Sequence, residues 1–108
     1  IFLYFDPDCE HCQKETKTII SHKEYLQGVR IFLVTNADEM SVKTFCKELR
    51  PDTVANVMVG KDYQYSFYRS FLPSTVPFMA IYNKRKKLAK LYIGETNINS
   101  VIEATKEL

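Results

Sequence analysis

Two cysteines, Cys9 and Cys12, are separated by two residues and directly follow the apolar run of residues 1–5. That run predicts a strand buried on both faces, and the sequence of residues 6–8, Asp-Pro-Asp, predicts a tight loop after it. A helix is expected to begin at that point. The pair therefore falls in a strand–loop–helix unit, with the first cysteine near a helix N-terminus and the second turned inward one turn later.

The pair has the arrangement that thiol–disulfide exchange requires. Exchange needs one exposed, easily ionised thiol and a second thiol that resolves the mixed disulfide. Unpaired N–H groups and the positive end of the helix dipole stabilise a thiolate at a helix N-terminus. Cys9 is therefore the predicted nucleophile and Cys12 the predicted resolving thiol, and their redox-active disulfide is the only cofactor expected. With three glycines and no glycine-rich phosphate loop, the sequence predicts no nucleotide or flavin site.

Three ionisable neighbours are candidates for tuning the pair. Glu10 disfavours a thiolate on the first cysteine by like charge, whereas a protonated His11 favours it, so the net effect is open. Glu15 lies three residues after Cys12 on the same predicted helix and could exchange a proton with the resolving thiol. The alternative for Glu15 is an ordinary solvated glutamate.

Two structural explanations of the pair stand beside the catalytic one: a static disulfide, or half of a zinc site. A zinc site needs four ligands, and His11, His22 and Cys46 do not have the spacing of a second ligand pair, so no metal is predicted. Gln13, where haem attachment needs histidine, excludes a covalent haem. Cys46 falls on the apolar stripe of a predicted helix and is expected to be a buried core thiol.

The rest of the chain alternates strands and helices. Residues 36–38 offer capping residues for the second helix, and Asn97 could cap the last one. The expected order is a strand at 1–5, a helix from 9 to about 26, a strand at 29–35, a helix after 36–38, a strand at 54–59, a helix through 63–71, a hairpin of 78–82 and 88–93, and a last helix from 97. This order predicts an α/β fold with a central mixed sheet, a βαβ unit followed by a ββα unit, and flanking helices.

Aromatic residues are concentrated in the predicted helix before the hairpin. Helical spacing makes most of them core residues, although one or two rings could line a substrate groove. The group consists of Tyr63, Tyr65, Phe67, Tyr68 and Phe71.

Composition limits the partners and the organisation of the chain. Its 108 residues fit a single domain, residues 1–108, with a sizeable core. A formal net charge of +2, evenly spread, provides no basic patch for nucleic acid. No apolar run approaches the roughly 20 residues that span a bilayer. Because a strand starts at Ile1 without a start methionine, we expect a fragment of a longer chain that lacks its N-terminal region and any leader or anchor in it.

The order of elements, the CxxC pair and the segment Thr75-Val76-Pro77 before the hairpin together resemble the thioredoxin superfamily. The resemblance covers the whole chain and implies a thioredoxin-like fold. The predicted helix and short strand between the βαβ unit and the proline segment are similar to the insertion of the TlpA/ResA-like branch, periplasmic thiol–disulfide oxidoreductases of bacteria. The sequence CEHCQKE at residues 9–15 is similar to the motif of that branch, in which a CxxC with glutamate second is followed by another glutamate.

The resemblance implies roles for individual residues. It makes Cys9 the attacking cysteine, Cys12 the buried one and Glu15 the carboxylate that handles protons. Pro77 is expected to be a cis-proline that faces the pair. Val76 in the same segment is expected to present its backbone to an extended substrate by strand-like pairing.

The resemblance also implies partners and a location. Protein thiols and disulfides are the expected substrates, and an upstream thiol reductant, which can be membrane-embedded, is the expected electron donor. The implied location is the periplasm or cell envelope of a bacterium, with attachment to the membrane through the missing N-terminal segment. We expect the domain to be monomeric.

Several positions depart from the branch and leave the direction of electron flow open. His11 stands where proline is usual, and both this histidine and the valine before the expected cis-proline are features of the strongly oxidising DsbA branch. Pro7 stands where an aromatic residue is usual, and the hairpin expected before the first strand is absent. The leading prediction is a reductase of protein disulfides. The alternatives are a DsbA-like oxidase that donates disulfides and a non-catalytic binding or scaffold domain.

Overall fold

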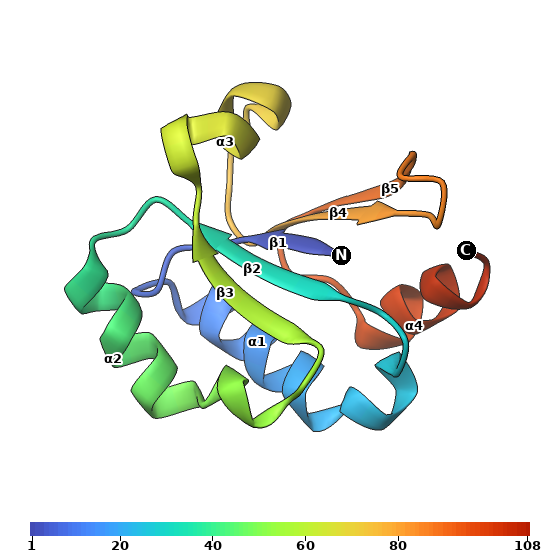
Figure 1. Cartoon of the computed structure of the whole chain (residues 1–108), viewed down its shortest axis with the longest axis horizontal. Coiled ribbons are helices and arrows are strands. Elements are labelled where there is room, and N and C mark those ends of the chain that lie inside the picture. Colours follow the sequence, from blue (N-terminus) through green and yellow to red (C-terminus); the bar gives the residue numbers. More distant parts are fainter.

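The structure is a computed structural model that describes residues 1–108, and its strands form one mixed sheet in the order β3-β2-β1-β4-β5. This arrangement confirms the predicted α/β fold, a βαβ unit followed by a ββα unit (Figure 1). The elements are β1 (Phe2–Tyr4), α1 (Glu10–Ser21), β2 (Ile31–Thr35), α2 (Glu39–Leu49), β3 (Val57–Lys61), α3 (Ser66–Phe71), β4 (Phe78–Tyr82), β5 (Leu88–Ile93) and α4 (Ile98–Lys106).

The short strand β1 lies at the centre of the sheet. It pairs in parallel with β2 and antiparallel with β4, so β3 and β5 form the two edges. An apolar sequence suits this position because a central strand packs on both faces, and Leu3 and Tyr4 are both buried. Beyond the strand, the N–H of Phe5 still donates to the carbonyl oxygen of Val34 at 3.0 Å. The sheet therefore fixes the chain up to the loop in which α1 begins.

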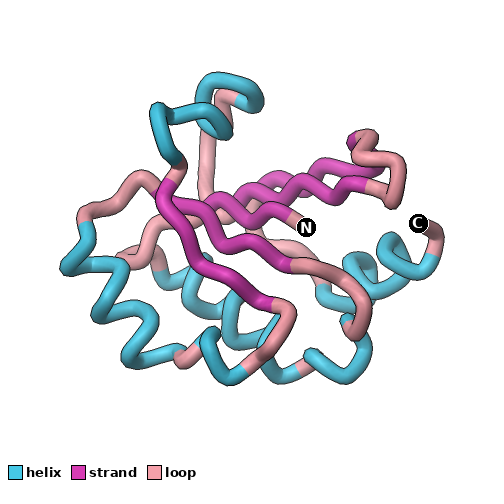
Figure 2. The backbone as a smooth tube through the Cα atoms, in the orientation of Figure 1, coloured by secondary structure: helices cyan, strands magenta, loops and turns pink.

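Helices cover the two faces of the sheet unequally. In Figures 1 and 2, α1, α2 and α4 lie on one face and α3 lies over the other. On the first face a single core cluster joins the strands to these three helices, and it includes Leu33, Met79, Ile19, Phe45 and Val101. Burying one such side chain stabilises the fold by about 1.5–3 kcal/mol relative to leaving it exposed.

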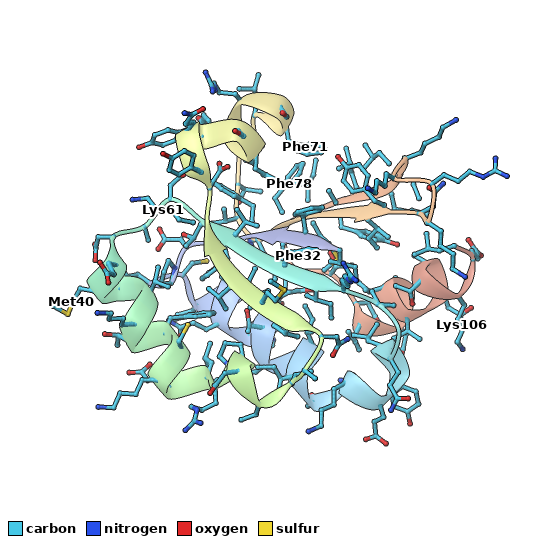
Figure 3. The ribbon with its side chains drawn as sticks, viewed as in Figure 1. Phe32, Met40, Lys61, Phe71, Phe78 and Lys106 are labelled. Carbon is cyan, nitrogen blue, oxygen red and sulfur yellow. The ribbon has the colours of Figure 1, made fainter.

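Aromatic rings pack beneath α3 on the other face. The ring centroid of Phe67 lies 4.6 Å from that of Phe71 and 6.0 Å from that of Phe78. Figure 3 shows Phe71 and Phe78 side by side, with centroids 5.7 Å apart. The core prediction is therefore confirmed in part for Phe67 and Phe71, which are half-buried, but it is wrong for the three tyrosines of the group. Tyr63, Tyr65 and Tyr68 are 77%, 58% and 42% exposed.

The first helix is shorter than predicted. It ends at Ser21, and residues 23–26 form a separate 3₁₀ turn. At this end, the hydroxyl of Ser21 donates to the carbonyl oxygen of Thr18, and Nδ1 of His22 bonds to the same oxygen. Such bonds compete with the helical ladder. Leu26 is nevertheless fully buried, so the predicted apolar face continues across the break.

The third helix starts later than predicted. The sequence spacing favours a helix from Tyr63, but α3 begins at Ser66, because Gln64 and Tyr65 both have a φ of 56°. Positive φ is not compatible with a right-handed helix. The carboxylate of Asp62 then accepts N–H groups from the first turn of α3 at 2.8 and 3.0 Å, which satisfies the donors that a helix start leaves unpaired.

The other predicted strands and helices have bounds close to those in the structure. The hairpin strands β4 and β5 have the predicted bounds, and the side chains of Asp38 and Asn97 cap α2 and α4 by accepting a backbone N–H. The strand β3 begins at Val57 rather than Val54, because a 3₁₀ turn at residues 51–53 precedes it.

Candidate active site

Cys9 occupies the N-cap position of α1, at the C-terminal end of the central strand. Its N–H donates to the carbonyl oxygen of Asp6 at 3.0 Å, which closes the loop. The side chain of Gln13 donates to the carbonyl oxygen of Pro7 at 2.8 Å and ties the loop to the helix. The Cys9 thiol is half-buried. It lies where unpaired N–H groups and the helix dipole favour a thiolate.

Cys12 lies one turn into α1 and is fully buried. The pKa of its thiol is raised to about 12, and burial is the largest cause. A hydrogen bond with the backbone of Asp6 lowers this pKa, whereas the hydrogen bond and the charge of the neighbouring Cys9 raise it. Both cysteines are free thiols in the structure. At neutral pH Cys12 is therefore protonated and needs a base before it can attack a mixed disulfide.

Glu15 is buried on the same helix, with only 3% of its surface exposed. Its Oε2 accepts the N–H of Thr96 at 3.0 Å, and neither oxygen bonds to Cys12. Burial raises the pKa of the carboxyl, the Thr96 hydrogen bond lowers it, and the charge of Glu95 raises it. The solvated alternative for Glu15 is therefore wrong. A buried carboxyl with a raised pKa, one turn from a buried thiol, is suited to exchange protons.

Glu10 and His11, the two residues between the cysteines, are exposed. Nδ1 of His11 lies 3.4 Å from Oε1 of Glu95, and Oε2 of that carboxylate lies 3.7 Å from Nζ of Lys14. Glu95 belongs to the loop between β5 and α4, so the fold brings it to the pair from near the end of the chain. Glu95 could not be identified from the sequence, because no motif or spacing links it to the cysteines.

The proline segment before β4 contacts the same loop. The Val76–Pro77 peptide bond is cis, and Pro77 is buried, whereas Thr75 is exposed. The carbonyl oxygen of Pro77 accepts the N–H of Gly94 at 2.8 Å. No hydrogen bond of this segment involves Cys9, so its role in substrate binding stays a prediction.

Cys46 lies outside the pair, on α2. It is half-buried against the core cluster, and burial, followed by the charge of Asp52, raises the pKa of its thiol. The prediction of a buried core thiol is confirmed in part. No three His, Cys, Asp or Glu side chains come together as a metal-binding group.

The chain has the thioredoxin-like fold, and the solved structures that it resembles are thioredoxin-like proteins. StoA from Bacillus subtilis is 17% identical, with a TM-score of 0.74 over 96% of this chain and 79% of that chain. A secreted Mycobacterium tuberculosis disulfide oxidoreductase homologous to E. coli DsbE is 13% identical, with a TM-score of 0.79 over 99% and 79%. The exposed lipoprotein thioredoxin Etrx1 from Streptococcus pneumoniae is 19% identical, with a TM-score of 0.74 over 99% and 82%.

These structural matches agree with the predicted thioredoxin-like fold. At such identities they establish the fold. No protein-family model and no curated protein sequence matches the chain. The chemistry must therefore be argued from the site itself.

Proposed function

We propose that the protein is a thiol–disulfide oxidoreductase that reduces disulfides in other proteins. The observation that carries the proposal is the pairing of a half-buried Cys9 at the N-terminus of α1 with a fully buried Cys12 one turn later. The first thiol can meet a substrate, whereas the second meets only a sulfur already bound to the first. Disulfide exchange requires this division of roles.

The reaction consists of two exchanges. The Cys9 thiolate attacks one sulfur of a substrate disulfide; a bond forms between Cys9 and the substrate, the substrate S–S bond breaks, and one substrate thiolate leaves and takes up a proton. Cys12 then gives its proton to a base, for which Glu15 is the candidate, and attacks the sulfur of Cys9. The second substrate thiol is released, the substrate has gained two electrons, and the pair is left as a disulfide.

Two further parts of the cycle follow from this chemistry. Residues 75–77 are proposed to hold an extended substrate segment by backbone pairing, with its disulfide directed at Cys9. The oxidised pair must then be reduced by an upstream thiol reductant. The Cys9–Cys12 disulfide is the only cofactor that the cycle requires.

The reducing direction is favoured over disulfide donation by the surroundings of His11. An imidazolium within a CxxC motif stabilises the thiolate, and with it the reduced form, which makes such a pair a stronger oxidant. Here the carboxylate of Glu95 lies 3.4 Å from the ring and offsets that charge.

We also propose that the protein works outside the cytoplasm, in the periplasm or cell envelope. Among its structural neighbours, one is described as secreted and another as an exposed lipoprotein. Disulfide substrates persist in such oxidising compartments. None of the helices in the structure is both long and apolar enough to cross a membrane.

Reduction of insulin disulfides tests the proposed function. We expect the reduced protein, mixed with insulin without another thiol, to form free thiols on insulin while Cys9 and Cys12 become a disulfide and Cys46 stays free. Thiol labelling and mass spectrometry measure all three changes. If the oxidised protein instead introduces disulfides into a reduced, unfolded polypeptide faster than the reduced protein reduces insulin, it is a disulfide donor. Exchange in neither direction would identify a binding or scaffold domain.

A further inference from the structure

The loop between β5 and α4 is anchored to the active site on both sides of Glu95. Gly94, with a φ of 82°, turns the chain out of β5, and its N–H donates to the carbonyl oxygen of Pro77 at 2.8 Å. The N–H of Thr96 donates to Oε2 of Glu15 at 3.0 Å. The backbone of Glu95, between these two hydrogen bonds, is therefore held against the start of α1.

The side chain of Glu95 contacts two residues of α1. One oxygen lies 3.4 Å from Nδ1 of His11, and the other lies 3.7 Å from Nζ of Lys14. The Glu95 side chain is 35% exposed, whereas those of its partners are 73% and 74% exposed. Glu95 is thus the least exposed of the three side chains, and its two basic partners are largely exposed to solvent.

We propose that Glu95 is a positioning residue that acts on Cys9 through His11. Its carboxylate holds the imidazole toward the β5–α4 loop and offsets the charge that His11 carries when protonated. This inference rests on the proposed function, in which Cys9 is the attacking thiolate, and deepens it. The contact restrains a histidine that otherwise favours the thiolate and the oxidising direction.

The charges around His11 determine whether loss of the Glu95 carboxylate favours or disfavours the Cys9 thiolate. With the carboxylate present, protonated His11 and Glu95 together carry no net charge. Without it, the imidazolium adds to the helix dipole in stabilising the Cys9 thiolate. The other ionisable groups near the pair are the same with and without the Glu95 carboxylate. They are Asp6 and Asp8 on the loop before α1, and Glu10, Lys14 and Glu15 on α1.

Alkylation of Cys9 by iodoacetamide at pH 5, where an imidazole stays protonated with or without a carboxylate partner, measures the thiolate fraction. In the fully reduced protein, with the label located by mass spectrometry, we expect Glu95→Gln to raise the rate about two- to fivefold, the range for an ion pair of this exposure. Glu103→Gln is the matched control, because it removes a carboxylate that pairs with Lys106 on α4, and its rate should equal that of the wild type. A Glu95→Gln rate no higher than the control overturns the proposal.

The same comparison in a His11→Ala background tests whether Glu95 acts through the imidazole. If it does, the effect of Glu95→Gln on the logarithm of the rate falls below half of its wild-type size. If half or more of the effect persists, Glu95 acts on Cys9 directly, and the proposal is overturned.

Because the alkylation uses no disulfide substrate, failure of the proposed reductase function is seen separately, in the insulin assay.

Discussion

Cys9→Ser is expected to lower the rate of insulin disulfide reduction to the rate measured without the protein. A serine hydroxyl is not ionised at neutral pH and does not attack a disulfide, so the first mixed disulfide cannot form. Cys12 cannot replace it, because its thiol is fully buried and burial raises its pKa to about 12. The assay follows insulin reduction in the presence of excess dithiol, with each variant at equal concentration.

Cys46→Ser is the matched control for this prediction. It also replaces one thiol by a hydroxyl, but on α2 and outside the pair, so it should retain the wild-type rate. Cys12→Ser should retain the first exchange and accumulate a disulfide between Cys9 and the substrate, visible on a non-reducing gel. Measurable activity of Cys9→Ser, or an equal loss in Cys46→Ser, would contradict the assignment of Cys9 as the nucleophile.

Glu15→Gln is expected to slow the second exchange, the attack of Cys12 on the mixed disulfide, by about 10²-fold. The amide keeps the shape of the side chain and an oxygen that can accept the N–H of Thr96, but it cannot take the proton of Cys12. The first exchange should keep its wild-type rate, because Cys9 does not depend on this base. Rapid quenching with acid, followed by mass spectrometry, measures how long the mixed disulfide persists.

The pH dependence of this step provides a second readout of Glu15. Burial raises the pKa of its carboxyl, so the carboxylate that accepts a proton forms only as the pH rises through a value above the usual range for glutamate. The wild-type rate of the second exchange should increase with pH through that value, and Glu15→Gln should lack the increase. Glu24→Gln, an exposed carboxylate after α1, is the control. An unchanged pH profile in Glu15→Gln would remove Glu15 from the mechanism.

The sheet could be predicted from sequence because its strands are apolar runs separated by polar turns. β4 and β5 have the predicted bounds for this reason. The ends of the helices were harder to predict from the sequence, because they depend on individual side chains and backbone angles. The end of α1 coincides with bonds from Ser21 and His22 to one carbonyl oxygen, and the start of α3 depends on the positive φ of Tyr65. Hydrophobic periodicity contains neither feature.

The candidate site was predictable only where it is local in sequence. Cys9 and Cys12 share one helical turn after a buried strand, so their positions at the N-terminus and in the core follow from spacing. The burial of Glu15 could not be read in the same way, because its hydrogen-bond partner Thr96 comes from the β5–α4 loop. The contact of Glu95 with the CxxC histidine has the same origin.

The reduction potential of the Cys9–Cys12 couple tests the proposed reductase most directly. It is obtained by equilibrating the protein with defined ratios of reduced and oxidised thiol, in a Cys46→Ser variant that keeps the third thiol silent. We predict a value near or below about −250 mV, in the range of reducing members of the thioredoxin-like proteins. A value near about −120 mV would contradict the proposal, because the reduced form would then be so stabilised that the protein donates disulfides instead of reducing them.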